Sequence, residues 1–274
     1  MRNVNVYGVK QGAVRAPQAA DWAISQGISS MTTSEVAVLL DVPEDQVRRR
    51  LAVPKARGEW IAPARGLWMP VQPQYRGAGG PPGIEFVDGL ARFLGVDYYV
   101  GWLTAAAHHG AAHHAPMVFQ VAVSKVVADR KVGGVRMLFL RRDRVGRVPT
   151  VMSRTYSGDV PFSTPAVTAL DVAADLDMAA GIDNAANVVI DLVGEAGLTA
   201  KQVADVAQWY PIAPVRRVGW IMDTFSEAKA LEPLVRYVQA SGVPPSLLHP
   251  EHGNRGRIDS VWQLRLNTEV DPDT

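Results

Sequence analysis

The feature that most constrains the fold is a break at residues 41–43, Asp-Val-Pro, between two short helical patterns. Before the break, the threonines at 32–33 can cap a helix whose apolar residues recur at helical spacing (Val36, Leu39 and Leu40). After it, Pro43 suits the first turn of a second helix. We expect this helix to end near Ala52, because Val53 precedes a proline and such residues are disfavoured in helices.

The segments on either side of these two helices complete a small domain. Residues 17–27 predict an earlier helix that ends at Gly27. Residues 60–69 predict a hairpin whose two strands flank a turn at 63–66. Helix, helix, turn, helix and hairpin is the order of a winged helix-turn-helix.

The rest of the chain is typical of a second, larger domain. Residues 72–83 are dominated by Gly and Pro and hold no apolar period, so they are the best linker candidate. We predict a winged helix-turn-helix domain at residues 1–75, a Gly/Pro linker at 76–83 and a C-terminal domain at 84–274. The fold class is therefore α+β, with a small sheet and several helices in the C-terminal domain.

The predicted C-terminal domain begins with helices at residues 84–95 and 97–112. Strand-like apolar runs follow, and from Thr164 onward helices dominate. The expected strands are 117–123, 135–140 and 150–155, and the expected helices are 164–179, 184–197, 199–210, 214–225 and 231–242. A late strand around 262–264 is expected to rejoin the sheet. The aromatic residues Tyr98, Tyr99 and Trp102 are expected in the core.

Charge is distributed unevenly along the chain, although the net charge is only +1. Residues 1–80 hold 10 Lys and Arg against 6 Asp and Glu, and residues 81–158 hold 10 against 5. Residues 159–274 hold 8 against 16. Clustered cations attract phosphate, so the first half of the chain is suited to a polyanionic partner.

Several classes of protein are excluded by what the sequence lacks. There is no cysteine, which excludes disulfides, thiolate catalysis and the usual structural zinc sites. No apolar run approaches the roughly 20 residues of a membrane helix, and residues 1–12 hold no apolar stretch resembling a secretory signal. A phosphate-binding glycine loop and a G-x-S-x-G elbow are also missing. We expect a cytoplasmic protein that is not an enzyme and needs no cofactor or metal.

The second helix of the helix-turn-helix predicts DNA binding. Val47 and Leu51 are four residues apart and should face the core, so the other side chains point outward. Arg can donate two hydrogen bonds to guanine, and Gln can pair with adenine. We predict base contacts from Gln46 and Arg49 and backbone contacts from Arg48, Arg50, Lys55, Arg57 and Arg65. The alternative is a solvated charged helix face.

A second group of basic residues follows the strand predicted at 135–140. It consists of Arg141, Arg142, Arg144 and Arg147. This second basic patch could extend a DNA footprint or bind another polyanion such as RNA. An exposed hairpin tip is the alternative interpretation.

Two clusters could hold a metal or do acid-base chemistry. Histidines 108, 109, 113 and 114 surround Gly110, which is expected to end a helix, so helical spacing of the ligands cannot be assumed. Asp171 and Asp175 share one helix face, with Asp177 nearby. Histidines near a helix C-terminus and a solvated acidic face explain both clusters without a ligand, and we predict no metal site.

Four motifs in order along the chain resemble the AbiEi family of antitoxins. They are RGLWMP at 65–70, YVGWLTAAAHHG at 99–110, STPAVTALD at 163–171 and RRVGWI at 216–221, within a match over roughly residues 18–240. Members of this abortive-infection family are paired with a nucleotidyltransferase-like toxin and repress their own toxin-antitoxin operon through the N-terminal winged domain. The resemblance implies an antitoxin and autorepressor that loads as two copies on inverted repeats. It leaves open whether the antitoxin and toxin form a direct complex.

Two other functions stay open beside the DNA-binding antitoxin. One is a ligand-responsive transcription regulator without a toxin partner, in which the C-terminal domain senses the ligand. The other is a metal-dependent enzyme that uses the histidine or aspartate cluster.

Overall fold

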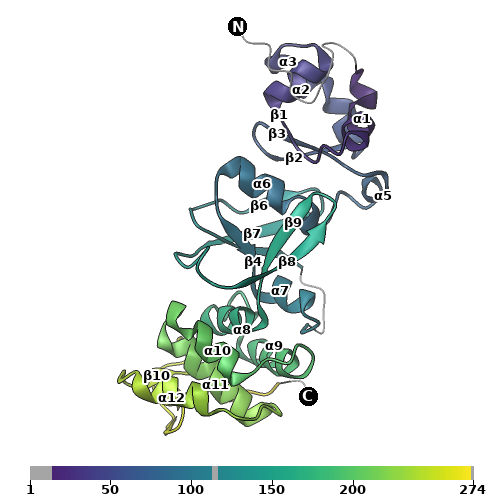
Figure 1. Cartoon of the computed structure of the whole chain (residues 1–274). Coiled ribbons are helices and arrows are strands. Elements are labelled where there is room, and N and C mark those ends of the chain that lie inside the picture. The colour runs from purple at the N-terminus through teal and green to yellow at the C-terminus, as the bar shows by residue number, and fades with distance from the viewer. Residues whose placement is uncertain (1–13, 113–116, 273–274) are drawn as a thin grey trace. The chain divides into compact units, whose positions relative to one another are not determined.

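The computed structural model describes residues 14–112 and 117–272 (Figure 1). These residues form two compact units, each made of several segments of the chain. Unit 1 consists of the described residues up to Asp97 with Val127–Phe139 and Ser153–Val160, and unit 2 of Tyr98–Val126, Leu140–Met152 and the described residues from Pro161 onward. The functional domain boundary expected at residues 76–83 stays a prediction.

Unit 1 begins with four short α-helices and a small sheet (Figure 1). The sheet has the strand order β1-β3-β2, and both pairs of strands are antiparallel. The elements are η2 (Ala16–Gln18), α1 (Ala19–Ser25), β1 (Met31–Thr32), α2 (Thr33–Leu40), α3 (Glu44–Arg50), α4 (Ala52–Ala56), β2 (Trp60–Ala64) and β3 (Leu67–Pro70). This is the element order that was predicted for the winged helix-turn-helix. The two residues of β1 were not predicted.

Local sequence explains how α2 begins and ends. Thr32 caps the helix by accepting a hydrogen bond from the Glu35 backbone N–H, and the Glu35 carboxylate accepts the Thr32 N–H at 2.6 Å. At the other end, Asp41 adopts a left-handed conformation with φ of 52° and turns the chain toward α3. Val47 and Leu51 are fully buried in the core of this domain, as predicted.

The helix after the turn is divided at Leu51. α3 ends at Arg50, close to the end expected near Ala52, but Val53 and Pro54 lie inside a further helix, α4, which was not predicted. Pro54 occupies the first turn of α4, where a backbone N–H has no helical partner to lose. Pro54 therefore fits the helix, although a residue that precedes a proline, here Val53, is disfavoured in helical conformation.

The remaining part of unit 1 follows the wing. It contains α5 (Pro73–Arg76), η3 (Gly83–Glu85) and α6 (Val87–Leu94). The segment predicted as a linker therefore includes helical turns. α6 ends at Gly95, whose φ of 62° is left-handed, as expected for a helix-stop glycine.

A six-stranded sheet has the order β6-β7-β5-β4-β9-β8. Its strands are β4 (Tyr98–Val100), β5 (Phe119–Val123), β6 (Arg130–Val132), β7 (Val135–Arg141), β8 (Thr150–Thr155) and β9 (Gly158–Ser163). β4 pairs antiparallel with β5 and parallel with β9. Three of these strands were predicted, whereas β4 was assigned to a helix. Tyr-Tyr-Val at 98–100 instead follows the preference of aromatic and β-branched residues for strands.

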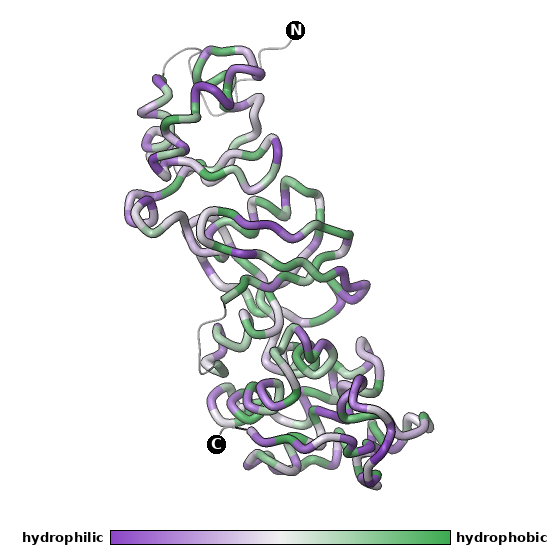
Figure 2. Tube along the Cα trace, turned by 180° about the vertical axis from the view of Figure 1, so that it is seen from behind, coloured by the Kyte–Doolittle hydropathy of each residue, from purple (hydrophilic) through white to green (hydrophobic). Residues whose placement is uncertain are grey.

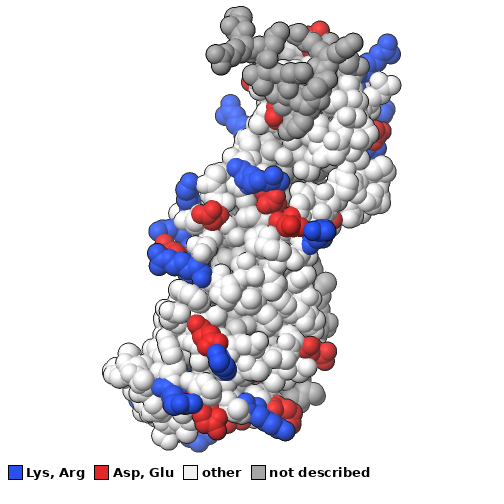
Figure 3. Space-filling view, viewed as in Figure 1, with Lys and Arg blue, Asp and Glu red and all other residues white. Residues whose placement is uncertain are grey.

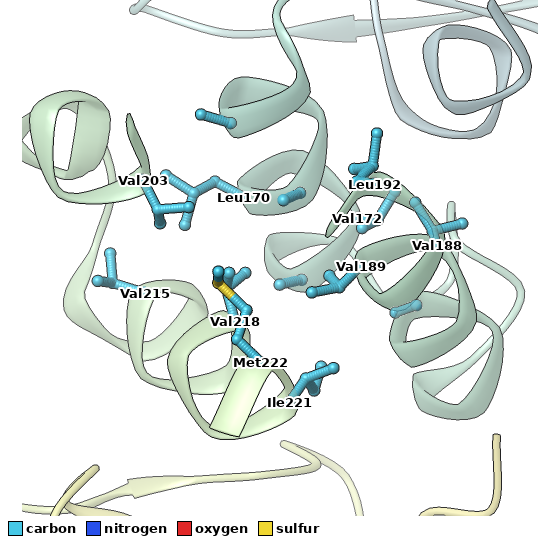
Figure 4. Close-up of a cluster of buried hydrophobic side chains, with 14 of the residues drawn as sticks. Leu170, Val172, Val188, Val189, Leu192, Val203, Val215, Val218, Ile221 and Met222 are labelled. Atoms are coloured by element: carbon cyan, nitrogen blue, oxygen red, sulfur yellow. The ribbon is translucent and has the colours of Figure 1, made fainter. Parts of the chain in front are cut away.

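Helices form the main core of unit 2. They are α7 (Trp102–His108), α8 (Pro165–Ala174), α9 (Ile182–Gly194), α10 (Ala200–Val206), η4 (Ala207–Trp209), α11 (Ile212–Phe225) and α12 (Glu232–Ala240). Figure 4 shows Leu170 of α8, Val189 of α9 and Val218 of α11 directed toward one another. Hydrophobic and hydrophilic residues alternate along the trace, as expected of amphipathic elements (Figure 2). Among the described residues no helix is long and apolar enough to cross a membrane.

The last strands form a separate sheet. β10 (Ser246–Leu247), β12 (Leu264–Leu266) and β11 (Arg257–Asp259) lie in that order, with β10 parallel and β11 antiparallel to β12. The late strand thus exists, but the prediction that it rejoins the main sheet was wrong. Arg216 and Arg217 of α11 hold this region because their buried guanidinium groups donate to carbonyls of residues 243–248.

Candidate nucleic-acid interface

The helix predicted to read DNA exposes its basic side chains. Arg48, Arg49 and Arg50 are exposed on α3, and Gln46 is half-buried. Val47 anchors the opposite face, since none of its surface is exposed. The seven-residue helix thus presents an uninterrupted run of three guanidinium groups to solvent.

A cleft of about 1020 Å³ lies between α3, α4 and the wing. Three of the predicted backbone contacts, Arg48, Lys55 and Arg65, line it together. Gln46, Arg49, Arg50 and Arg57 do not line it. Glu44, Asp45 and Asp129 also line the cleft, so its charge is mixed.

The six basic side chains predicted to contact DNA are unpaired. Within the described part of the chain none of them forms an ion pair or a side-chain hydrogen bond (Arg48, Arg49, Arg50, Lys55, Arg57 and Arg65). Their charges are available to an external anion. Figure 3 shows one face of the molecule, on which basic and acidic side chains adjoin in several places.

Two hydrogen bonds to Thr33 hold the wing. Trp68 Nε1 donates to Thr33 Oγ1 at 3.1 Å, and the Thr33 N–H donates to the Gly66 carbonyl at 2.9 Å. Ala64 pairs with Leu67, so Arg65 and Gly66 form a two-residue turn, with Gly66 at φ of 90°. This geometry places Arg65 at the exposed tip of a rigid hairpin.

A segment that is distant in sequence also contributes to this region of unit 1. Arg130 of β6 donates from Nη1 to the Pro63 carbonyl at 3.0 Å, and Asp129 and Arg130 line the cleft. Burial lowers the pKa of Arg130 below its ordinary value. Sequence analysis missed this segment. The Gly-Gly pair at 133–134 between short apolar runs is the hairpin signal that could have found it.

The second basic patch is largely neutralised inside unit 2. Arg142 pairs with Asp175 and stacks over the Trp102 ring, and Arg144 Nη2 lies 2.8 Å from Asp171 Oδ1. Arg141 pairs with Asp143 at the surface (2.8 Å). Arg147 is exposed and has no ion pair among the described residues. The use of this patch for a polyanion stays a prediction, with fewer free cations than the sequence suggested.

Asp171 lies in the interior rather than on a solvated helix face. Its carboxylate has no exposed surface and accepts hydrogen bonds from Tyr210 (2.8 Å) and Tyr99 (3.3 Å). Burial raises the pKa of Asp171, and the guanidinium of Arg144 opposes that rise. Sequence spacing correctly placed Asp171 and Asp175 near each other, but it could not show that both face arginines from a preceding loop.

The two described histidines of the cluster at 108–114 have protein partners. The His108 ring stacks on Phe162 with centroids 4.0 Å apart, and His109 Nε2 forms a hydrogen bond with the Ser163 carbonyl at 2.7 Å. Burial, followed by the neighbouring His109, lowers the pKa of His108. His113 and His114 lie outside the described residues, as do residues 1–12. Within the described ranges no three His, Asp or Glu side chains are placed to hold a metal ion.

The comparisons with known proteins identify the middle part of the chain. Residues 99–224 match the model of the AbiEi antitoxin C-terminal domain. This part of the chain is an AbiEi antitoxin C-terminal domain. The matched segment contains the whole buried network of Arg144, Asp171 and Tyr210, so this network lies within the AbiEi antitoxin domain. AbiEi antitoxins are regulatory proteins of toxin-antitoxin systems.

The chain also resembles a solved structure over nearly its whole length. The crystal structure of the RV2827C protein from Mycobacterium tuberculosis matches with a TM-score of 0.63 and 15% identity, covering 93% of each chain. At this identity the likeness shows the fold alone. No curated protein matches the chain.

Proposed function

We propose that this antitoxin binds operator DNA through its winged helix-turn-helix and represses its own toxin-antitoxin operon. The observation that carries the proposal is the set of six exposed basic side chains on α3, α4 and the wing, none of which has an acidic partner among the described residues. An ordinary surface intersperses basic side chains with acidic ones. A run of cations left unpaired on one helix and its wing is instead the electrostatic footprint of a phosphate backbone.

The proposed roles follow the exposure and position of each side chain. Gln46 and Arg49 make base contacts from α3. Arg48, Lys55 and Arg65, which share the cleft, hold phosphates on the wing side. Arg50 and Arg57 contact the backbone at the edges. Asp45, which also lines the cleft, disfavours a phosphate beside it and so helps to fix the register of the duplex.

The antitoxin function resides in the other part of the molecule. We propose that the AbiEi domain counteracts a nucleotidyltransferase-like toxin in the cytoplasm, and that two copies of the chain load on inverted repeats. Support for the toxin class and the operator arrangement comes from the family alone. The buried ion pairs of Arg142 and Arg144 stabilise this domain rather than serve a polyanion.

A reporter experiment tests both halves of the proposal in cells. The gene's own promoter drives the reporter, and the toxin gene is induced separately. Wild-type protein should lower reporter output and restore growth in the presence of the toxin. Arg48→Ala combined with Arg49→Ala should relieve repression while leaving growth rescue intact, because both side chains lie on α3, outside the matched antitoxin domain at residues 99–224. Arg236→Ala combined with Arg265→Ala is the charge-matched control. Equal repression by wild type and the α3 variant would contradict the proposal.

A further inference from the structure

The β6–β7 hairpin belongs to the same compact unit as the winged helix-turn-helix. Three contacts fix it there. Arg130 donates to the Pro63 carbonyl in the wing at 3.0 Å, and β6 lies against β2. At the tip, the Gly134 N–H donates to the Gly79 carbonyl at 3.1 Å. The hairpin is therefore a fixed part of the surface beside the wing.

The tip of this hairpin requires glycine. Gly133 has φ of 57°, and a Cβ at this position would lie 2.3 Å from the Gly79 carbonyl oxygen. A side chain here is excluded both by the left-handed backbone and by the approach of another backbone segment. The close approach sets the position of the strand residues next to the tip.

Two cations face each other across the hairpin. Lys131 and Arg136 are direct partners in the antiparallel ladder, and both are exposed. Neither forms an ion pair within the described part of the chain. Like charges directly opposite each other destabilise an antiparallel pair. An anion bound between them removes this repulsion.

Lys131 of this pair lines a hollow of about 200 Å³ between α4 and the hairpin, whereas Arg136 lies outside its lining. Lys55 of α4 and Lys131 of the hairpin line this hollow, and no acidic residue lines it. Trp60 also lines it, and the Nε1–H of Trp60 is buried without a hydrogen-bond partner among the described residues. Two ammonium groups and an unused N–H donor provide the chemistry that recognises a phosphate.

We propose that Lys131 and Arg136 of the hairpin, together with Lys55, bind a phosphate of the DNA backbone. The hairpin thus acts as a second basic ridge beside the wing. This inference rests on the proposed DNA binding. It adds the β6–β7 hairpin, which comes about 60 residues after the wing, to the surface that contacts DNA. A free phosphate ion has the same chemistry, and the experiment separates the two sources.

The test uses the full chain and fluorescence anisotropy on its own promoter duplex and on a scrambled duplex across a salt series. Lys131→Ala combined with Arg136→Ala should lower the slope of log affinity against log salt by about 0.9 for each lost phosphate contact, on both duplexes alike. Lys229→Ala combined with Arg257→Ala removes the same charge from exposed positions of unit 2 and should leave the slope unchanged. Lys131→Arg combined with Arg136→Lys keeps the charges and should bind as wild type.

Each contrary result has its own meaning. If the wild type does not prefer its promoter, the proposed repressor function fails. If the wild type binds and Lys55→Ala flattens the slope, but the hairpin double variant keeps the wild-type slope, the hairpin inference alone is overturned. Calorimetry of the DNA-free protein with inorganic phosphate completes the test. No binding at micromolar phosphate supports a backbone phosphate, whereas saturable binding that the double variant loses would reassign the site to a free anion.

Discussion

The guanidinium of Arg144 lies 2.8 Å from the carboxylate of Asp171, a side chain with no exposed surface. The same guanidinium lies over the Tyr210 ring, 4.1 Å from its centroid, and Tyr210 donates to the same carboxylate oxygen. One arginine from the loop after β7 therefore neutralises the buried acid of α8. This relationship stabilises the AbiEi domain and removes Arg144 from any polyanion-binding role.

Removal of Arg144 should destabilise the protein strongly. Arg144→Met leaves the Asp171 carboxylate buried without its cation, which costs about 3–5 kcal/mol. Combining it with Asp171→Asn should recover part of that loss, since no buried charge then remains. Urea denaturation of both variants measures the free energies of unfolding. Arg141→Met is the control, because its pair with Asp143 is exposed and contributes about 0–1 kcal/mol. Equal losses for Arg144→Met and Arg141→Met would contradict this account.

The cap of α2 should contribute measurably to the stability of the winged domain. Thr32→Ala removes the side chain that accepts the Glu35 N–H and should lower the free energy of unfolding by about 1 kcal/mol. Ser34→Ala, at an exposed position inside the same helix, is the matched control and should change stability little. Thermal unfolding followed by circular dichroism compares the two. A Thr32→Ala variant as stable as the control would show that the capping box does not hold this helix.

Protonation of His108 should destabilise the fold at mildly acidic pH. Burial lowers the pKa of His108 in the folded state, so below the unfolded value of about 6.5 the unfolded chain binds more protons than the folded one. The contribution of His108 is therefore complete above that pH and is lost as pH falls toward the folded pKa. His108→Phe keeps an aromatic ring against Phe162 but cannot take a proton.

Urea denaturation between about pH 7.5 and about pH 5.5 tests this titration. The wild type should lose more stability than His108→Phe over that interval. The comparison between the two proteins cancels the other histidines, including His249, whose pKa is also lowered. A difference that stays constant with pH would exclude His108 as the source.

Base and phosphate contacts should respond differently to substitution. Arg49→Ala should cost about 1–3 kcal/mol on operator DNA and relax the preference at one base position, because a bidentate contact to a base is lost. Lys55→Ala should weaken binding to all sequences alike and lower the salt slope by about 1. Competition binding against a set of single-base operator variants separates these effects. Identical profiles for the two variants would place α3 outside the major groove.

Local signals predicted much of this fold correctly. The capping threonine of α2, the proline after the turn and the spacing of Val36, Val47 and Leu51 act over a few residues, so the sequence alone reveals them. The helices after Thr164 were likewise predictable from their apolar spacing. The AbiEi resemblance stated from four motifs is confirmed by the domain match at residues 99–224.

Features that depend on distant partners were not predictable in the same way. Asp171 was assigned to a solvated face because its neighbours in sequence give no sign of Arg144, whose guanidinium arrives from a different element. The strand at Tyr98–Val100 exists because β5 and β9 pair with it on either side. The Arg130 contact to the wing joins residues 67 positions apart, and only the folded chain reveals it.

The most direct test of the central claim is fluorescence anisotropy of the purified protein on a duplex from its own promoter and on a scrambled duplex. The salt concentration runs from about 50 to about 200 mM, over which binding through several phosphate contacts weakens by orders of magnitude. A DNA-binding antitoxin should bind the promoter more tightly than the scrambled duplex, with steep salt dependence on both. Absent binding, or equal affinity for the two duplexes, would contradict the repressor function.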